Sequence, residues 1–142
     1  MKNTIVAGLD IGSVSAKLVF TGNICVNPTD FSEWKIDSQT FWVSPAVLVQ
    51  GQPLRAARLL LERMFAAVPN AEIQLQMTGG QAGEAAKQFA VPVVNEFKAI
   101  ARGVVEWDAD CSTVLEIGGD GSRFISVRFD KKNGNMTLLD YQ

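Results

Sequence analysis

The sequence predicts an α/β protein whose strands and helices pack in layers around one mixed sheet. Strand-length apolar segments with glycine-rich turns lie near both ends of the chain, and segments with helical spacing of apolar residues lie between them. The predicted order of elements is β-β-β-α-β-α-α-β-β-β. We see no low-complexity segment and no internal boundary, so we expect residues 1–142 to form a single domain.

The first predicted strands flank a short turn. Residues 4–9 (TIVAGL) are apolar and partly β-branched, which indicates a buried strand, and residues 16–20 (AKLVF) alternate between two faces. We expect the two segments to pair antiparallel around residues 10–15. After a loop over residues 27–32, residues 34–43 predict a third, more polar strand, which ends at Ser44-Pro45.

The middle of the chain has helical periodicity. Residues 52–68 predict a helix with Pro53 in its first turn, and its inward positions are Leu54, Ala57, Leu61 and Met64. Residues 72–77 alternate strictly, as in a half-buried strand, and residues 78–80 (TGG) then open a helix over residues 81–89. A further helix is expected over residues 95–107, with Asn95 as its N-cap. Its inward positions are Phe97, Ile100, Ala101 and Val104.

The last third of the chain repeats the opening pattern. Residues 113–117 predict a strand, residues 118–122 a glycine-rich turn and residues 123–129 an alternating strand. The Asn133-Gly134 pair is typical of a two-residue hairpin turn, here leading to a strand over residues 136–139.

Composition excludes several classes of function. The chain is 47% hydrophobic and 20% charged, as in globular proteins, and its net charge of −2 argues against a nucleic-acid surface. It contains no histidine, which rules out a Ser-His-Asp triad and any histidine-bound metal within the chain. Cys25 and Cys111 lack the spacing of a metal or redox motif, so we interpret them as small buried hydrophobic residues. We find no membrane span or signal peptide and expect a cytoplasmic protein.

Two turns share a pattern that suits phosphate binding. Residues 10–17 (DIGSVSAK) and 116–123 (EIGGDGSR) each place an acid at a strand end, then glycines and hydroxyls, then a cation on the returning strand. Glycines let backbone amides approach an anion, Lys17 can neutralise a phosphate, and the acids can hold hydrated Mg²⁺. One such turn is usually only structural, but two matching turns favour a site. A P-loop and a dinucleotide fingerprint both fit the sequence worse.

Three stretches carry a resemblance to a known family. Residues 8–17 (GLDIGSVSAK), 91–103 (VPVVNEFKAIARG) and 114–123 (VLEIGGDGSR) resemble the CoA-enzyme activases. These are the ATP-hydrolysing activators of 2-hydroxyacyl-CoA dehydratases and benzoyl-CoA reductases, within the superfamily of actin, heat-shock chaperones and sugar kinases. The Thr78-Gly79-Gly80 turn fits as well, and the match covers the N-terminal half of the family's sequence.

The resemblance implies a ribonuclease-H-like mixed sheet with flanking helices, one subdomain of an actin-like ATPase fold. The chain would be half of a two-lobed nucleotide-binding domain that uses ATP/ADP and Mg²⁺. Glu96 would be catalytic by facing the hydrolytic water, although an acid in a first helical turn is also favoured by the helix dipole. The resemblance assigns phosphate contacts to Gly12, Ser13, Ser15, Lys17, Gly118, Gly119 and Ser122, and water-mediated Mg²⁺ contacts to Asp10 and Glu116.

The second turn departs from the family pattern, which reads Asp-Ile-Gly-Gly-Gln-Asp-Ser-Lys. Glu116, Asp120, Gly121 and Arg123 stand at its four altered positions. The longer Glu116 suits the strict octahedral geometry of Mg²⁺ less well, and Asp120 adds negative charge near the phosphates. The family's second half, with its adenosine pocket and cluster-ligating cysteine, has no counterpart here, so we expect no iron–sulfur cluster on this chain.

The leading hypothesis is therefore the nucleotide-binding half of an activator that drives electron transfer to a CoA-ester dehydratase or reductase. The expected partners are the second lobe of the ATPase and the dehydratase or reductase component, a homodimer is allowed, and neither nucleic acid nor membrane is expected. Alone, the chain would be weakly active or inactive. Two alternatives stay open: a non-catalytic actin-like interaction module with a degenerate nucleotide site, and another kinase of the superfamily.

Overall fold

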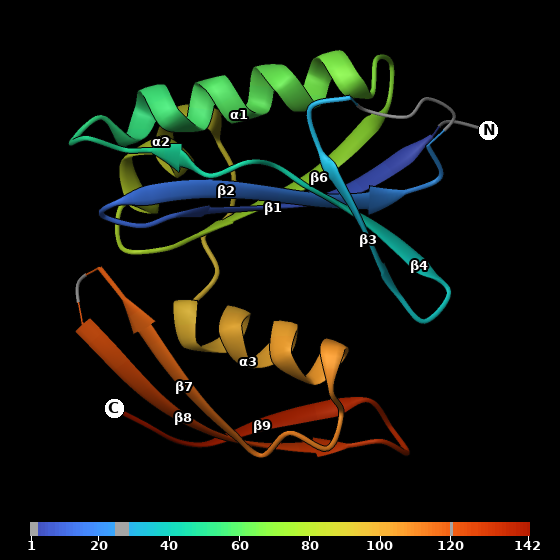
Figure 1. Cartoon of the computed structure of the whole chain (residues 1–142), viewed down its shortest axis with the longest axis vertical. Coiled ribbons are helices and arrows are strands. Elements are labelled where there is room, and N and C mark those ends of the chain that lie inside the picture. Colours follow the sequence, from blue (N-terminus) through green and yellow to red (C-terminus); the bar gives the residue numbers. More distant parts are fainter. Residues whose placement is uncertain (1–2, 25–28, 120) are drawn as a thin grey trace. The chain divides into compact units, whose positions relative to one another are not determined.

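A computed structural model of the chain describes residues 3–24, 29–119 and 121–142. The chain divides into two compact units, Met1–Val93 and Val94–Gln142, and each unit has its own sheet (Figure 1). The expectation of one sheet is therefore wrong. The six strands of the first unit form one hydrogen-bonded sheet, and the three strands of the second unit form another. That residues 1–142 form one half of a nucleotide-binding domain stays a prediction.

The first unit contains a six-stranded mixed sheet. Its strands are β1 (Thr4–Ile11), β2 (Ser15–Gly22), β3 (Ser32–Ile36), β4 (Gln39–Val43), β5 (Val47–Leu48) and β6 (Glu72–Thr78). The strand order is β3-β4-β2-β1-β6, with β5 paired to β2. β1 runs antiparallel to β2 and parallel to β6, so the predicted opening hairpin and the mixed sheet are confirmed.

The third predicted strand, residues 34–43, is in fact two strands joined by a tight turn. Ile36 pairs with Gln39, which leaves Asp37 and Ser38 as the turn, and Asp37 adopts φ 51°. Aspartate tolerates this left-handed conformation better than most residues, which is why the chain reverses here. The alternating pattern on both sides of the turn concealed the reversal.

Helices α1 (Pro53–Ala67) and α2 (Ala82–Phe89) match their predicted ranges to within a residue or two. In Figure 1, α1 runs along one face of the sheet, and it contacts β1, β2 and β5, while α2 contacts β6. Of the predicted inward positions of α1, Ala57, Leu61 and Met64 are buried and Leu54 is half-buried, and Leu60 is buried as well.

The core of the first unit uses every second residue of its central strands. The side chains that pack toward the helices are Ile5, Ala7, Leu9 and Ile11 from β1 and Ala16, Leu18 and Phe20 from β2. Because successive strand residues point to opposite faces, Asp10 and Lys17 lie on the other face of the sheet, where both are exposed.

The second unit packs helix α3 (Glu96–Trp107) on an antiparallel sheet. Its strands are β7 (Thr113–Gly118), β8 (Gly121–Asp130) and β9 (Asn135–Tyr141), in the order β7-β8-β9. The buried residues are Ala101, Val105, Ile125 and Val127. Ala101 was expected inside, whereas Val104 is only half-buried and its neighbour Val105 takes the core position.

The β8–β9 turn differs from its prediction. Asp130 pairs with Asn135, so the loop has four residues, Lys131 to Gly134, instead of the two that Asn133-Gly134 suggested. Gly134 adopts φ 70° and donates its N–H to the Asp130 carbonyl at 2.8 Å. Glycine thus still provides the left-handed position that closes the turn.

The cysteine that the structure describes, Cys111, is not fully buried. Cys111 is a free thiol that is half-buried rather than buried, and its Sγ donates to the Thr113 carbonyl at 3.3 Å. Cys25 lies outside the described residues. Among the described residues, no helix has the length and apolar character needed to cross a bilayer.

Candidate functional site

The first candidate turn joins β1 to β2 and holds an acid and a cation side by side. Asp10 and Lys17 are register partners across the antiparallel pair, and both belong to the exposed face of the sheet. Lys17 has no ion pair within the described part of the chain. Its ammonium is therefore available to an anion.

The turn between these strands consists of Gly12, Ser13 and Val14, and Ser15 is the first residue of β2. Gly12 donates its N–H to the Ser15 carbonyl at 3.0 Å, and Val14 accepts from the Val49 N–H at 2.9 Å, so the turn is anchored at both sides. The Gly12 amide is thus used within the turn. The half-buried hydroxyls of Ser13 and Ser15 make no hydrogen bond to any described residue, which leaves them as donors for a ligand.

A third segment reaches the same edge of the sheet. β6 lies parallel to β1 on the side away from β2, and Thr78 is the register partner of Asp10. Gly79 follows with φ 99°, and a Cβ built on it would lie 2.5 Å from Asp10 Oδ1 and against the Ile11 carbonyl. Gln81 then donates its N–H to that carbonyl at 3.0 Å. The glycine turn before α2 is therefore packed directly against the Asp10 carboxylate.

This edge suits a hydrated divalent cation held by one carboxylate. Mg²⁺ typically takes one or two protein carboxylates and completes its shell with water and phosphate oxygens. Asp10 is an exposed carboxylate beside a cation, two hydroxyls and a glycine turn, so the residues fit such an ion. No group of three or more His, Cys, Asp or Glu side chains among the described residues is placed to hold a metal, so a cage made by the protein alone is not seen here.

The second candidate turn joins β7 to β8 and has the same register. Glu116 pairs with Arg123 as Asp10 pairs with Lys17, Gly118 pairs with Gly121, and Gly119 lies in the turn that follows β7. Asp120 lies outside the described residues. Gly121 adopts φ 143°, a conformation that a residue with a side chain rarely adopts.

Arg123 is engaged by two acids. Its Nη1 lies 2.7 Å from Glu116 Oε2, and its Nη2 lies 3.1 Å from Glu96 Oε2. A Cβ on Gly118 would lie 2.7 Å from Glu116 Oε1, so the glycine makes room for this carboxylate. Both acids that were expected to serve metal and water are thus ion-paired to the same guanidinium. Glu116 can hold a metal only if it gives up this partner.

The predicted site residues fall into two groups. Asp10, Gly12, Ser13, Ser15 and Lys17 lie together in the first unit, and Glu96, Glu116, Gly118, Gly119 and Ser122 lie in the second. Their roles stay predictions.

Sequence reasoning missed two participants. Gly79 packs against Asp10, a contact that depends on the parallel pairing of β6 with β1, which sequence spacing does not specify. The ion pair between Arg123 and Glu96 had no sequence signal.

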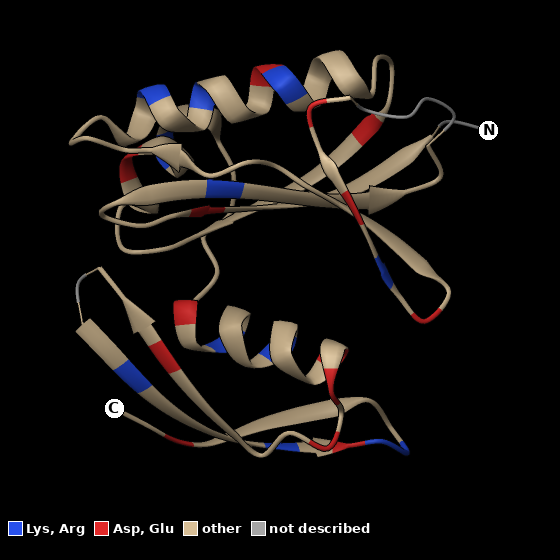
Figure 2. Cartoon of the chain, in the orientation of Figure 1, with Lys and Arg blue, Asp and Glu red and all other residues tan. Residues whose placement is uncertain are grey.

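Charged residues are spread over both units rather than gathered in one segment (Figure 2).

Comparisons with known proteins identify the fold. No protein-family model matches the chain, and no curated protein matches it either. Component A of (R)-2-hydroxyglutaryl-CoA dehydratase from Acidaminococcus fermentans matches with a TM-score of 0.62 and 20% identity, over 98% of this chain and 46% of that one.

Two further solved structures match over nearly the whole chain. A Ppx/GppA family member from Aquifex aeolicus has a TM-score of 0.56 at 13% identity, over 99% of this chain and 50% of its own. The ethanolamine utilization protein EutJ from Carboxydothermus hydrogenoformans has a TM-score of 0.57 at 12% identity, over 97% and 50%. The chain has the mixed α/β architecture of actin-like ATPase fold proteins, as expected, and spans about half the length of these structures.

Proposed function

We propose that this chain binds the phosphates of ATP through the β1–β2 turn and forms the nucleotide-binding half of an ATP-hydrolysing activator. The observation that carries the proposal is the convergence at one sheet edge of Asp10, Lys17 and the Gly79 turn. An ammonium group, hydroxyl donors and one carboxylate are the groups that a metal-bound polyphosphate requires.

Each residue has a distinct role in this proposal. Lys17 neutralises a terminal phosphate, Ser13 and Ser15 donate hydrogen bonds to phosphate oxygens, and Asp10 holds Mg²⁺ through its water shell. The bound Mg²⁺ neutralises charge on the phosphates. In the second unit, Gly118, Gly119 and Ser122 supply backbone and hydroxyl donors to phosphate oxygens, and Glu96 orients the attacking water.

The activator role rests on two supports of different kind. Residues 8–17, 91–103 and 114–123 resemble the CoA-enzyme activases, and component A of 2-hydroxyglutaryl-CoA dehydratase shares the fold. In this proposal the parent protein includes a second lobe and drives electron transfer to a CoA-ester dehydratase or reductase in the cytoplasm. The chain itself carries no iron–sulfur cluster.

The first test is calorimetric titration of MgATP into the wild-type chain and the Asp10→Ala/Lys17→Ala double variant. We expect binding to weaken at least tenfold, because charge-assisted hydrogen bonds contribute about 1.5–3 kcal/mol each. Glu33→Ala/Lys35→Ala is the matched control, since it removes an exposed acid–lysine pair from β3. The proposal would be overturned if the wild type, the double variant and the control all bind MgATP with equal affinity, both in this chain and in the longer parent protein.

A second candidate, a non-catalytic interaction module, is favoured by the two acids held on Arg123. In that case the second turn has lost its nucleotide role while the fold persists.

The activase pattern is restored by four substitutions made together: Glu116→Asp, Asp120→Gln, Gly121→Asp and Arg123→Lys. A gain of ATPase activity in the parent would indicate a decayed site, no change would favour the module, and phosphate transfer to an acceptor would indicate a kinase.

A further inference from the structure

Three charged side chains from three elements meet in the second unit. Glu96 comes from the first turn of α3, Glu116 from β7 and Arg123 from β8. The two carboxylates use separate nitrogens of one guanidinium, at 3.1 and 2.7 Å. Each of the three side chains is about three-quarters buried, with exposed fractions of 26–28%. Two negative charges therefore share one cation in a partly desolvated place.

The cation is enclosed on a further side. The Arg123 guanidinium lies 5.9 Å from the centre of the Phe97 ring, which itself contacts Tyr141. An aromatic face attracts a cation and keeps water from it. The Glu116 carboxylate also lies beside Gly118, where a Cβ would come within 2.7 Å of its Oε1. The acids are thus held in place around the charge they share.

A positive charge between two carboxylates is also what a divalent cation provides in proteins. Two carboxylates brought to one point repel each other unless a positive charge lies between them. Mg²⁺ and Ca²⁺ are held in proteins by carboxylate oxygens of this kind. Arginine provides the charge permanently, since its guanidinium stays protonated in proteins, and its planar fork spans two acceptors.

We infer that Arg123 takes the place of a divalent cation between Glu96 and Glu116, so that the β7–β8 hairpin needs no metal. A consequence, which rests on the proposed function, is that the Mg²⁺ of a bound nucleotide is held at Asp10 and not at Glu116. Arg123 is then a positioning residue that fixes the Glu96 carboxylate.

The experiment asks whether removal of Arg123 creates a metal site. Every protein in the experiment is the full chain with Asp10→Asn, so that the Asp10 carboxylate, the other predicted Mg²⁺ ligand, does not bind the added metal. Arg123→Ala is expected to bind Mn²⁺ in calorimetry and to gain several degrees in Tm when millimolar Mn²⁺ is added, because a ligand that binds only the folded state stabilises it. Arg123→Lys retains a cation and is expected to show neither effect, like the background protein that carries Asp10→Asn alone.

A second carboxylate variant completes the design. Glu116→Gln added to Arg123→Ala is expected to abolish the gain. The inference would be overturned if Arg123→Ala folds but neither binds Mn²⁺ nor gains stability from it. It would also be overturned if the Asp10→Asn background protein, with Arg123 intact, binds Mn²⁺ and Glu116→Gln abolishes that binding. Where Arg123→Ala and Arg123→Ser both fail to fold in metal-free buffer, Mn²⁺ is expected to restore cooperative unfolding, and failure to do so contradicts the inference. No nucleotide is used, so the outcome is independent of ATP binding.

Discussion

Lys17 lies directly opposite Asp10 in the β1–β2 register, on the exposed face of the first sheet. The second hairpin repeats this relationship with Arg123 opposite Glu116. The electrostatic outcome differs, because Arg123 is held by two acids while Lys17 has no ion pair within the described residues. The same spacing of acid, glycine and cation therefore gives a first turn whose lysine has no ion pair among the described residues and a second turn whose arginine is ion-paired to two acids.

Gly79→Ala is expected to destabilise the chain by about 1–3 kcal/mol, because alanine at φ 99° is strained and its Cβ would meet Asp10 Oδ1 and the Ile11 carbonyl. Urea unfolding followed by circular dichroism measures the loss. The displaced Asp10 carboxylate is also expected to weaken MgATP binding in calorimetry.

Gly80→Ala is the matched control for this substitution. Gly80 is the next residue, its Cβ would meet no atom within 4 Å, and its φ is not in the left-handed range. We expect its unfolding free energy to stay close to that of the wild type. Equal losses at both positions would show that the contact of Gly79 with Asp10 does not matter.

The periodicity of the sequence was sufficient for most helices and strands but not for the sheets. Helices over residues 53–67 and 96–107 followed from apolar spacing and from the Asn95 cap. The division into two sheets did not follow, since strand partners are chosen by contacts between segments far apart in the chain. The reversal at Asp37 was missed because the alternation continues on both sides of it.

The candidate site was predictable to the extent that it is local. The pairing of Asp10 with Lys17 follows from a hairpin centred on residues 12–15. The contact of Gly79 with Asp10 depends on the parallel pairing of β6 with β1, which sequence spacing does not specify. The engagement of Glu96 by Arg123 depends on how α3 packs against its sheet. The first turn could therefore be described correctly while the charge balance of the second could not.

Asn95→Ala is expected to cost about 0.5–2 kcal/mol of stability, because Asn95 Oδ1 accepts the Lys98 N–H at 3.2 Å and satisfies one of the unpaired donors at the start of α3. Thermal unfolding monitored by circular dichroism measures the change. Asn95→Asp keeps an acceptor at the N-cap and is expected to retain the stability of the wild type. A loss of the same size in both variants would assign the effect to something other than capping.

Ser44→Ala is expected to destabilise the first unit by about 1–3 kcal/mol, because it leaves a buried donor without a partner. Ser44 is 5% exposed, and its Oγ accepts the Leu18 N–H at 2.9 Å and donates to the Pro45 carbonyl. Ser38→Ala is the control, since Ser38 is exposed and its hydroxyl has no partner among the described residues. Urea unfolding should separate the two variants, and an unchanged midpoint for Ser44→Ala would contradict the bond's importance.

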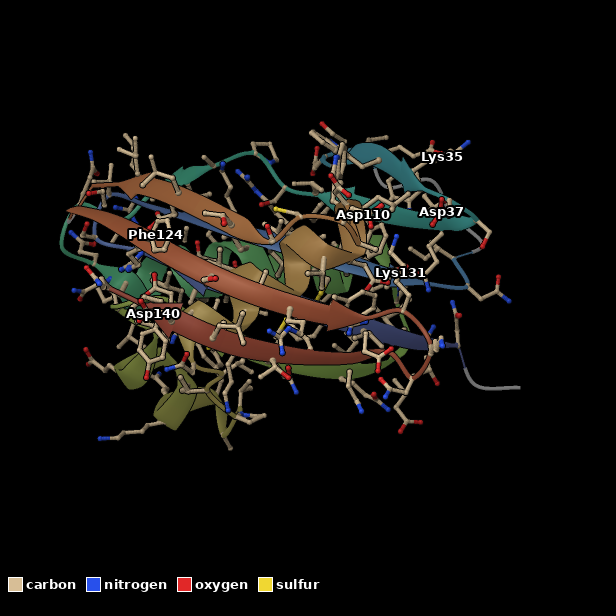
Figure 3. The ribbon with its side chains drawn as sticks, turned by 90° about the horizontal axis from the view of Figure 1, so that it is seen from below. Lys35, Asp37, Asp110, Phe124, Lys131 and Asp140 are labelled. Carbon is tan, nitrogen blue, oxygen red and sulfur yellow. The ribbon has the colours of Figure 1, made fainter. Side chains whose placement is uncertain are left out.

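The three-stranded sheet of the second unit has one face packed on α3 and one face exposed, and this predicts opposite results for two isoleucines. Figure 3 views the exposed face, on which Phe124 lies. Ile117 is 78% exposed, whereas Ile125 is fully buried beneath α3. Ile117→Ala should therefore change the unfolding free energy by less than about 0.5 kcal/mol, while Ile125→Ala should lower it by about 2–5 kcal/mol through the cavity it leaves. Both are measured by urea unfolding at the same protein concentration. A loss above about 1 kcal/mol for Ile117→Ala would mean that this face is buried in the protein in solution, since exposed side chains contribute little to stability.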